Sequence, residues 1–481
     1  MCHGLFDLIL VFPSLFCRSA MKKYKYICAV QCRIMKVRKN IVVVVFMLLA
    51  GLIACVCAVR WKAWFGNPPE AAYLVPVVPD RVMLSMSPSR SQAWRRVSWR
   101  CDTVVREASV EVIDYVVNDT VFYLADKRRV WSRSGQQMYY QAEFPVVEGR
   151  YSYRVHNDSL CSPYYSFEVK NDEEWTVLLF GDLQDEEAKP FATMLQEVIE
   201  LHPEVDVCAF TGDMVERPTD DYWNVWFASV SPIVGKVPIV ACPGNHEHLK
   251  GWKRTLDQRF VASFGESVVR ASRGNVHYEW DNMTWVSLNT DVSFHVNELF
   301  RQKQTMSQEG WMDEDGKWKV LMMHHPFYPA SLGRHFSITR QVFQPFVRDK
   351  GVHLVVNGHD HVYARRVEKK NNVPITPIYM VCNSSDKHYL ANCDAGFDRV
   401  TCGHRIYSLL RVTKDTLHVQ TYLADTHALY DELFCRRVGD TVFVEDKKPQ
   451  QGELLDVSSR YERPSKKKQR QQFLKKKAQR R

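Results

Sequence analysis

Apolar and polar residues alternate over short stretches between about residues 79 and 170. Segments such as ASVEVIDYVV and GRYSYRVH follow this pattern and are separated by short polar turns. A period of two is typical of strands with one buried face, and strands at this regular spacing predict a small antiparallel β-sandwich.

The pattern changes at about residue 171, where wholly apolar runs alternate with segments of helical periodicity. Runs rich in Val and Leu predict strands buried on both faces; they cover residues 175–180, 205–210, 237–242, 318–323 and 352–357. Between the first two, FATMLQEVIELH repeats its apolar residues at helical spacing. Residues 277–289 predict a hairpin, and residues 405–424 predict a closing antiparallel pair. Residues 171–444 are therefore expected to form an α/β domain.

A long uncharged stretch precedes both regions. Residues 41–59, IVVVVFMLLAGLIACVCAV, are long enough to cross a bilayer and predict a transmembrane signal anchor. Basic residues before it place residues 1–40 in the cytoplasm, with Met35 as an alternative start, and the rest of the chain in the periplasm or outside the cell. Residues 60–78 would be a linker. The alternatives are a lipoprotein cleaved at Cys55 and a protein secreted after signal cleavage.

Positive charge is concentrated at the two ends of the chain. The formal net charge is +9, but the last sixteen residues hold nine Lys or Arg, and without them 55 bases face 55 acids. The body between the ends is mildly acidic, so a nucleic-acid partner is not expected. Residues 445–481 are polar and basic, and predict a disordered tail.

Each of the five predicted α/β strands runs into polar side chains that are able to bind a metal ion. These are Asp182, Asp213, Asn245, His324, and His359 with His361. Because the carboxyl ends of such strands form the ligand crevice, these residues are expected to converge. Two carboxylates, an amide oxygen and three imidazoles favour Zn, Mn or Fe over Ca. Six donors are too many for one catalytic ion, so two metal ions with one bridging aspartate are expected.

The order GD, GD, GNHE, HHPFY, GHDHVYARR resembles that of the calcineurin-like metallophosphoesterases and, within them, the purple acid phosphatases. The resemblance implies an α/β fold in which a four-layer α/β/β/α metallophosphoesterase sandwich follows the membrane anchor and a small β-sandwich. It also implies that residues 79–170 form the fibronectin-III-like N-terminal domain of that group.

The same resemblance implies a role for each candidate residue. Asp213 would bridge the two metals. Asp182 and His361 would bind the first metal, and the second would be held by Asn245, His324 and His359. The catalytic histidines would be His246 and His335, which resemble the family's substrate-contacting groups near the leaving oxygen.

Two positions depart from the family pattern. Gln184 stands where relatives have histidine or glycine, and Glu216 stands where purple acid phosphatases have the tyrosine that gives their colour. We therefore expect no purple colour, and we expect Gln184, Glu216 or water to complete the first metal site. The alternative is that both side chains face solvent or bond to the backbone.

These features predict a metal-dependent phosphoester hydrolase in which a metal-bound hydroxide attacks phosphorus. A phosphomonoesterase acting on small-molecule phosphoesters is the favoured form. A phosphodiesterase or nucleotide pyrophosphohydrolase would use the same ligands. A catalytically impaired binding module would keep the fold but hold one metal ion or none.

Overall fold

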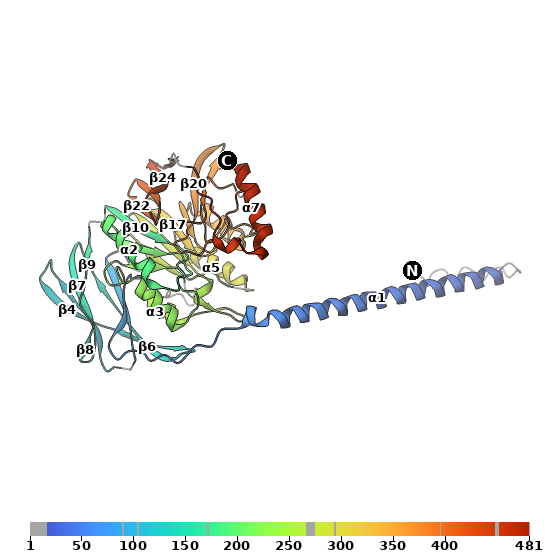
Figure 1. Cartoon of the computed structure of the whole chain (residues 1–481), viewed down its shortest axis with the longest axis horizontal. Helices are drawn as coiled ribbons and strands as arrows, with labels where there is room; N and C mark the ends of the chain where they lie inside the picture. Colours follow the sequence, from blue (N-terminus) through green and yellow to red (C-terminus); the bar gives the residue numbers. More distant parts are fainter. Residues whose placement is uncertain are drawn as a thin grey trace. The chain divides into compact units, whose positions relative to one another are not determined.

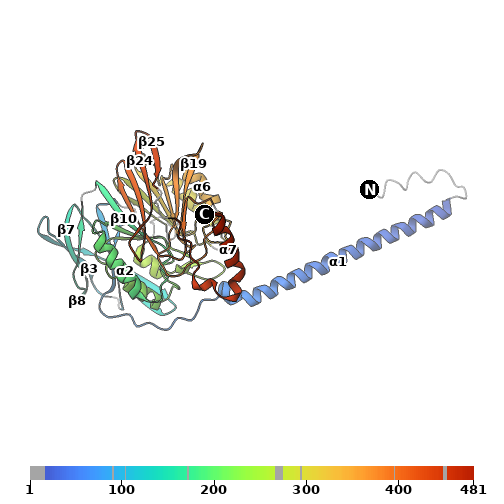
Figure 2. The same ribbon diagram turned by 45° about the horizontal axis from the view of Figure 1, so that its top comes forward.

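The computed structural model of the chain describes residues 17–88, 91–102, 105–170, 173–265, 275–292, 295–394, 396–447 and 452–480. It divides into two compact units, Met1–Asn67 and Pro68–Arg481. The described part of the first unit is dominated by one helix and that of the second by β-sheets. Figures 1 and 2 show the helix in blue and the sheets in colours from cyan to red.

The first unit contains helix α1 (Cys17–Phe65). Its segment Lys23–Phe65 includes a window with a mean hydropathy of 3.1, none of which is buried. The helix is therefore long and apolar enough to cross a membrane, by length and composition. It includes the predicted span at 41–59 and continues to Phe65, so the predicted linker begins with helical residues.

The second unit contains an 11-stranded sheet, counted over the described residues. At its centre β10 (Glu174–Phe180), β11 (Val207–Phe210) and β12 (Ile239–Ala241) run parallel. The remaining strands extend this sheet on both sides: β25 (Thr441–Asp446), β24 (Leu429–Val438), β23 (Thr416–Leu423) and β22 (Ile406–Thr413) before β10, and β1 (Asp80–Met86), β2 (Trp94–Cys101), β6 (Gly135–Pro145) and β5 (Asp126–Ser132) after β12.

A second, 7-stranded sheet of described residues carries the other metal-ligand candidates. Its order is β15 (Val276–Glu279), β16 (Met283–Leu288), β17 (Trp318–Met323), β18 (Leu354–Asn357), β20 (Val373–Val381), β19 (Tyr363–Lys370) and β21 (Arg399–Thr401). Strands β16, β17, β18 and β20 run parallel to one another, whereas β15 and β19 pair antiparallel at the two sides of this group. The predicted strands, hairpin and closing pair are therefore confirmed.

The two sheets pack face to face, and helices cover their other faces. Val177 and Leu179 of β10 share a core with Val320 and Met322 of β17, whereas Leu178 of β10 packs in a different core with the helices α2, α3 and α4. Alternate residues of one strand thus enter two apolar layers, which explains the uninterrupted apolar runs. In Figure 1, α2 and α3 appear in green beside β10.

The helices of the second unit are short and amphipathic or buried. Helices α5 and α6 pack on the 7-stranded sheet through Leu299 and Phe343. The helices and the small hairpin are α2 (Ala188–Leu201), α3 (Asp220–Ser229), α4 (Gln258–Phe264), α5 (Asn297–Gln308), α6 (Ile338–Asp349) and α7 (Lys467–Arg480), with β13 (His248–Leu249) and β14 (Thr255–Leu256).

The N-terminal strands form a sandwich that is not physically separate from the α/β part. Strands β1, β2 and β6 pack over a common core against a sheet of β4 (Asp119–Leu124), β3 (Ala108–Asp114), β7 (Gly149–Asn157), β8 (Leu160–Cys161) and β9 (Tyr165–Val169). Strand β1 also pairs parallel with β12 through Ser85 and Ile239. One face of the sandwich is therefore part of the 11-stranded sheet.

A buried ion network strengthens this junction. Asp220, at the start of α3, lies 3.0 Å from Nη2 of Arg81, 2.9 Å from Nη1 of Arg100 and 2.8 Å from Nη1 of Arg259. All four side chains are almost fully buried. Since breaking one partner of a buried charge cluster leaves an uncompensated charge, the network ties β1 and β2 to α3 and α4.

The prediction of a disordered basic tail is wrong for residues 467–480, which form helix α7, drawn in dark red at the C-terminus in Figure 2. Phe473 is completely buried in an apolar cluster with Leu455 and Tyr461. Arg480 lies 2.6 Å from Glu453. The composition indicated solvation, but one aromatic side chain and bases paired with acids of the body hold the helix in place.

The cysteines whose side chains the structure describes, from Cys28 to Cys435, are free thiols. Cys208 lies in β11 and Cys242 directly follows β12, and both are buried. Cys382, Cys393 and Cys402 are also buried and unbridged. Burial raises the pKa of the Cys402 thiol to about 12, so this thiol is unreactive at neutral pH.

Candidate metal centre

The carboxyl ends of strands from both large sheets meet at one site. Asp182, Asp213 and Asn245 follow β10, β11 and β12 of the 11-stranded sheet. The histidines follow β17 and β18 of the 7-stranded sheet; they are His324, His359 and His361. The predicted convergence of the candidate ligands is thus built from two facing sheets, with carboxylates and amide on one and imidazoles on the other.

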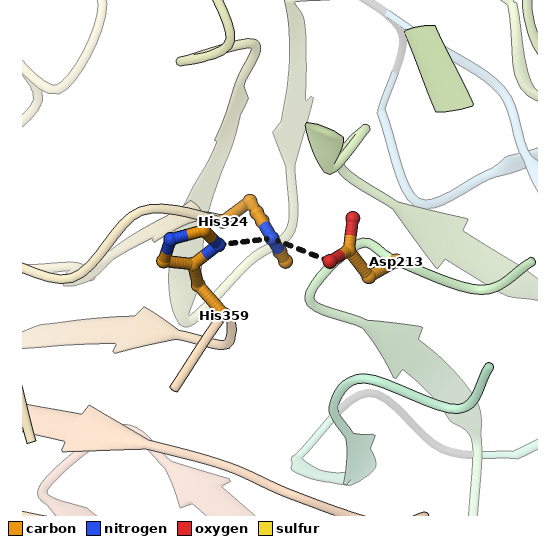
Figure 3. A group of neighbouring side chains, drawn as sticks. All are labelled: Asp213, His324 and His359. Carbon is orange, nitrogen blue, oxygen red and sulfur yellow. Dashed lines mark hydrogen bonds and ion pairs between the residues drawn. The ribbon is translucent and has the colours of Figure 1, made fainter. Parts of the chain in front are cut away.

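Asp213, His324 and His359 form the centre of the site (Figure 3). Their ligand atoms all lie within 4.8 Å of one another. Nε2 of His324 is 3.0 Å from Oδ2 of Asp213 and 3.2 Å from Nδ1 of His359. The other ring nitrogen of His324, Nδ1, donates to the carbonyl oxygen of Thr211 at 2.9 Å. That bond fixes the ring so that Nε2 faces the other two ligand candidates.

Three further ligand candidates keep a donor atom that is buried and has no hydrogen-bond partner among the described residues. These atoms are Oδ2 of Asp182, Oδ1 of Asn245 and Nδ1 of His361. The second oxygen of Asp182, Oδ1, accepts the backbone N–H of His359 at 2.7 Å. Because buried polar atoms are otherwise almost always satisfied, the unpartnered atoms fit the coordination of metal ions.

The backbone is constrained at the same residues. Asp182, Asp213, His359 and His361 all have positive φ, between 48° and 76°. Non-glycine residues rarely adopt this left-handed conformation, and it is concentrated at functional sites. Gly244 explains part of the constraint, since a Cβ there would lie only 2.2 Å from Oδ1 of Asp213.

Glu247, the last residue of GNHE, organises two of the ligand loops and was not assigned a role from the sequence. Its buried carboxylate accepts four backbone N–H groups: Gly244 at 2.7 Å, Met214 at 2.8 Å, Asp213 at 2.9 Å and Val215 at 3.2 Å. It therefore joins the loop after β11 to the loop after β12, and fixes the backbone of Asp213. The position of Glu247 in the GNHE motif could have indicated a role in the site. Its hydrogen bonds to the loop after β11, however, can be seen only in the folded structure.

Burial and the neighbouring charges set the ionisation of the ligand candidates. Burial lowers the pKa of His324, but the adjacent Asp213 carboxylate outweighs it and raises that pKa to about 10. Burial, reinforced by Asp213, raises the pKa of Asp182 to about 7. Burial also holds the pKa values of His359 and His361 well below the usual range. Both imidazoles are therefore neutral, the state in which they bind metal.

The two candidate catalytic histidines lie on different sides of the site. Nδ1 of His246 is 2.5 Å from the carbonyl oxygen of Glu216, and its Nε2 is 3.9 Å from Oδ2 of Asp213. His335 is exposed and lines a pocket of about 480 Å³ together with His325 and His359. His246 is thus close to the bridging position, whereas His335 reaches the site through the pocket.

Gln184 and Glu216 do not point freely into solvent. The ammonium group of Lys387 donates to Oε1 of Gln184 at 2.8 Å and to Oε2 of Glu216 at 3.1 Å. Lys387 lies in the loop after β20, within SSDKHY, a stretch that resembles no metal-ligand motif. The sequence therefore gave no signal for this contact.

Residues 176–363 match the family model for calcineurin-like phosphoesterases, a range that includes all six ligand candidates. This part of the chain is therefore similar to the calcineurin-like phosphoesterases. The chain is 26% identical to purple acid phosphatase 23 of Arabidopsis thaliana over 42% of its own length and 45% of that protein. It is 24% identical to acid phosphatase type 7 of Homo sapiens over 45% of its own length and 53% of that protein.

The chain spans about half the length of these two curated relatives. The solved structure of the purple acid phosphatase PPD1 from yellow lupin (Lupinus luteus) seeds superposes with a TM-score of 0.59 at 14% identity, covering 80% of this chain and 78% of that one. These comparisons support the resemblance to the purple acid phosphatase-like metallophosphoesterases that the motifs indicated. The fibronectin-III-like nature of the N-terminal strands stays a prediction.

Proposed function

We propose that this protein is a phosphomonoesterase that works with two metal ions. The observation that carries the proposal is the convergence of Asp213, His324 and His359 within 4.8 Å. The unpartnered donor atoms of the other ligand candidates support it. The first ion would be held by Asp182, Asp213 and His361. The second would be held by Asp213, Asn245, His324 and His359.

The donor set of carboxylate, amide and imidazole suits Mn, Zn or Fe. Bound there, such ions supply positive charge to the phosphoryl oxygens and lower the pKa of water. Glu247 and Thr211 hold Asp213 and His324 in place through the hydrogen bonds described above. The neutral imidazoles of His359 and His361 bring lone pairs without bringing charge.

The two catalytic histidines would serve the leaving group. The carbonyl of Glu216 accepts the Nδ1 proton of His246, which orients its Nε2 toward the site. His335, which lines the pocket, would donate a proton to the departing oxygen, a task that suits imidazole. Gln184 and Glu216, as additional ligands of the first ion, would first have to leave Lys387.

The proposal extends to location and architecture. Helix α1 would anchor the protein in a membrane, with the phosphoesterase domain on the periplasmic or extracellular side and small-molecule phosphoesters as substrates. The packing of helices on the outer faces of two facing sheets supports the four-layer α/β/β/α arrangement. The sandwich of β1 to β9 supports a fibronectin-III-like domain.

The test uses the full chain in detergent, stripped with a chelator and reloaded with Mn, Zn or Fe. We expect metal-dependent hydrolysis of an aryl phosphate monoester, faster than that of the matching diester. Asp213→Asn should reduce the rate by more than about 100-fold, since groups beside a ligand already change metal affinity by 10- to 100-fold. Asp415→Asn, in an exposed turn, is the matched control.

Other outcomes have defined meanings. Preference for the diester would replace the phosphomonoesterase with a phosphodiesterase or nucleotide pyrophosphohydrolase. If metal binds but no ester is hydrolysed with any ion, the protein is a binding module on the same fold. Equal activity of Asp213→Asn and the wild type would place the chemistry elsewhere.

A further inference from the structure

One lysine contacts both positions at which the chain departs from the purple acid phosphatase pattern. Lys387 donates to Oε1 of Gln184 at 2.8 Å and to Oε2 of Glu216 at 3.1 Å, and about a quarter of its side chain is exposed. Gln184 is two residues beyond Asp182 and is almost completely buried. The two oxygens that were expected to complete the first metal site are therefore already bound to a cation.

The loop that carries Lys387 runs beside the first metal position. The backbone N–H of Tyr389 donates to the carbonyl oxygen of His361 at 3.2 Å, and the two rings lie 4.8 Å apart. The ammonium group therefore lies on the side of the centre that carries Asp182 and His361.

We propose that Lys387 is a built-in cation that weakens metal binding at the first position. This inference rests on the proposed dinuclear centre and adds an asymmetry to it. The ammonium group repels a metal ion at the first position. It also occupies the oxygen atoms of Gln184 and Glu216, which would otherwise be free to bind that ion. Asp182, Asp213 and His361 are left to hold the first ion alone. The two ions therefore bind with unequal affinities, the first more weakly than the second.

The test is a Mn(II) titration of the metal-free full chain in detergent, followed by calorimetry and by metal analysis after equilibrium dialysis. The wild type should show one tight and one weak class of site. Lys387→Met removes the charge at similar length and should tighten the weak class by roughly 10- to 100-fold, leaving the tight class unchanged. Lys387→Arg keeps the charge and should keep the weak class weak.

Glu216→Gln should change the Mn(II) affinity of the weak site in the opposite direction. It leaves Lys387 without its neutralising carboxylate, so the weak class should weaken further. A variant that merely disturbed the fold would not tighten one class selectively. Lys369→Met is the matched control, because its ammonium lies 2.7 Å from Asp398 near the far end of β19, and it should behave as wild type.

The inference is overturned if Lys387→Met leaves the weak class within threefold of the wild type, or if Lys387→Arg tightens it equally. Two tight sites in the wild type would overturn it as well, while leaving the proposed function intact. A wild type that binds no Mn(II), Zn(II) or Fe(II) would instead remove the proposed function. If the wild type binds one ion and Lys387→Met binds two, the inference is supported.

Discussion

Exchanging Glu247 for glutamine tests whether this buried carboxylate holds the ligand loops together. Each of its oxygens accepts two backbone N–H groups: Oε1 accepts Met214 and Val215, and Oε2 accepts Asp213 and Gly244. A glutamine amide has one oxygen and one NH2 group. In either orientation of the amide, the NH2 group faces two N–H donors and accepts neither.

The magnitude follows from this count. Two hydrogen bonds to a charged acceptor are lost, each worth about 1.5–3 kcal/mol, and two buried donors are left without partners. Glu247→Gln should therefore lower the free energy of unfolding by about 3–6 kcal/mol. It should also loosen Asp213, whose backbone N–H is one of the four, and so reduce the metal content of the purified protein.

The assay is urea unfolding of the full chain in detergent, followed by tryptophan fluorescence. The measurement is made at pH 9, so that the carboxylate that accepts the four backbone N–H groups is ionised. Glu197→Gln on α2 is the control, because Glu197 is exposed and its loss should cost at most about 0.5 kcal/mol. A loss below 1 kcal/mol for Glu247→Gln would refute the reasoning.

Three further predictions concern other parts of the chain. Burial lowers the pKa of His353 to about 3, so below pH 6.5 only the unfolded chain protonates this residue; His353 should contribute about 2 kcal/mol to the fall in unfolding free energy from pH 7 to pH 5, and His353→Asn should reduce that fall by about this amount in pH-dependent urea titrations. Phe473→Ala removes a fully buried ring, worth about 3–5 kcal/mol, and should release α7, seen as faster hydrogen exchange over residues 467–480 alone; faster exchange throughout the body would contradict it. Protein loaded with Fe(III) should lack the purple absorption band, because Glu216 replaces the tyrosine; a band in the visible spectrum would contradict this.

Much of the α/β part could be predicted because its strands are uninterrupted apolar runs that are followed directly by polar residues. A strand such as β10 places Val177 and Leu178 in different apolar layers, so its apolar run has no polar interruption until the strand ends. The chain then turns into the site, and polar ligand candidates such as Asp182 mark that turn. The signal was strong because strand and candidate ligand are adjacent in the sequence.

Contacts between distant segments were beyond the sequence pattern. Lys387 reaches Gln184 across 203 residues, and neither residue lies in a motif that pairs them. The division of the ligand candidates between two sheets depends on strand order, which periodicity does not encode. Helix α7 was mispredicted because net charge dominates its composition, whereas burial of the single ring of Phe473 decides its position.

The pairing of β1 with β12 crosses the boundary that the sequence pattern indicates near residue 171. The two regions differ in their hydrophobic pattern but share one sheet. A break there would strip β12 of a neighbouring strand and remove two of the three arginines that surround Asp220. The exposed edge would be free to pair with other chains. The N-terminal strands are therefore structurally part of the α/β domain, and we expect neither segment to stay folded when it is separated from the other.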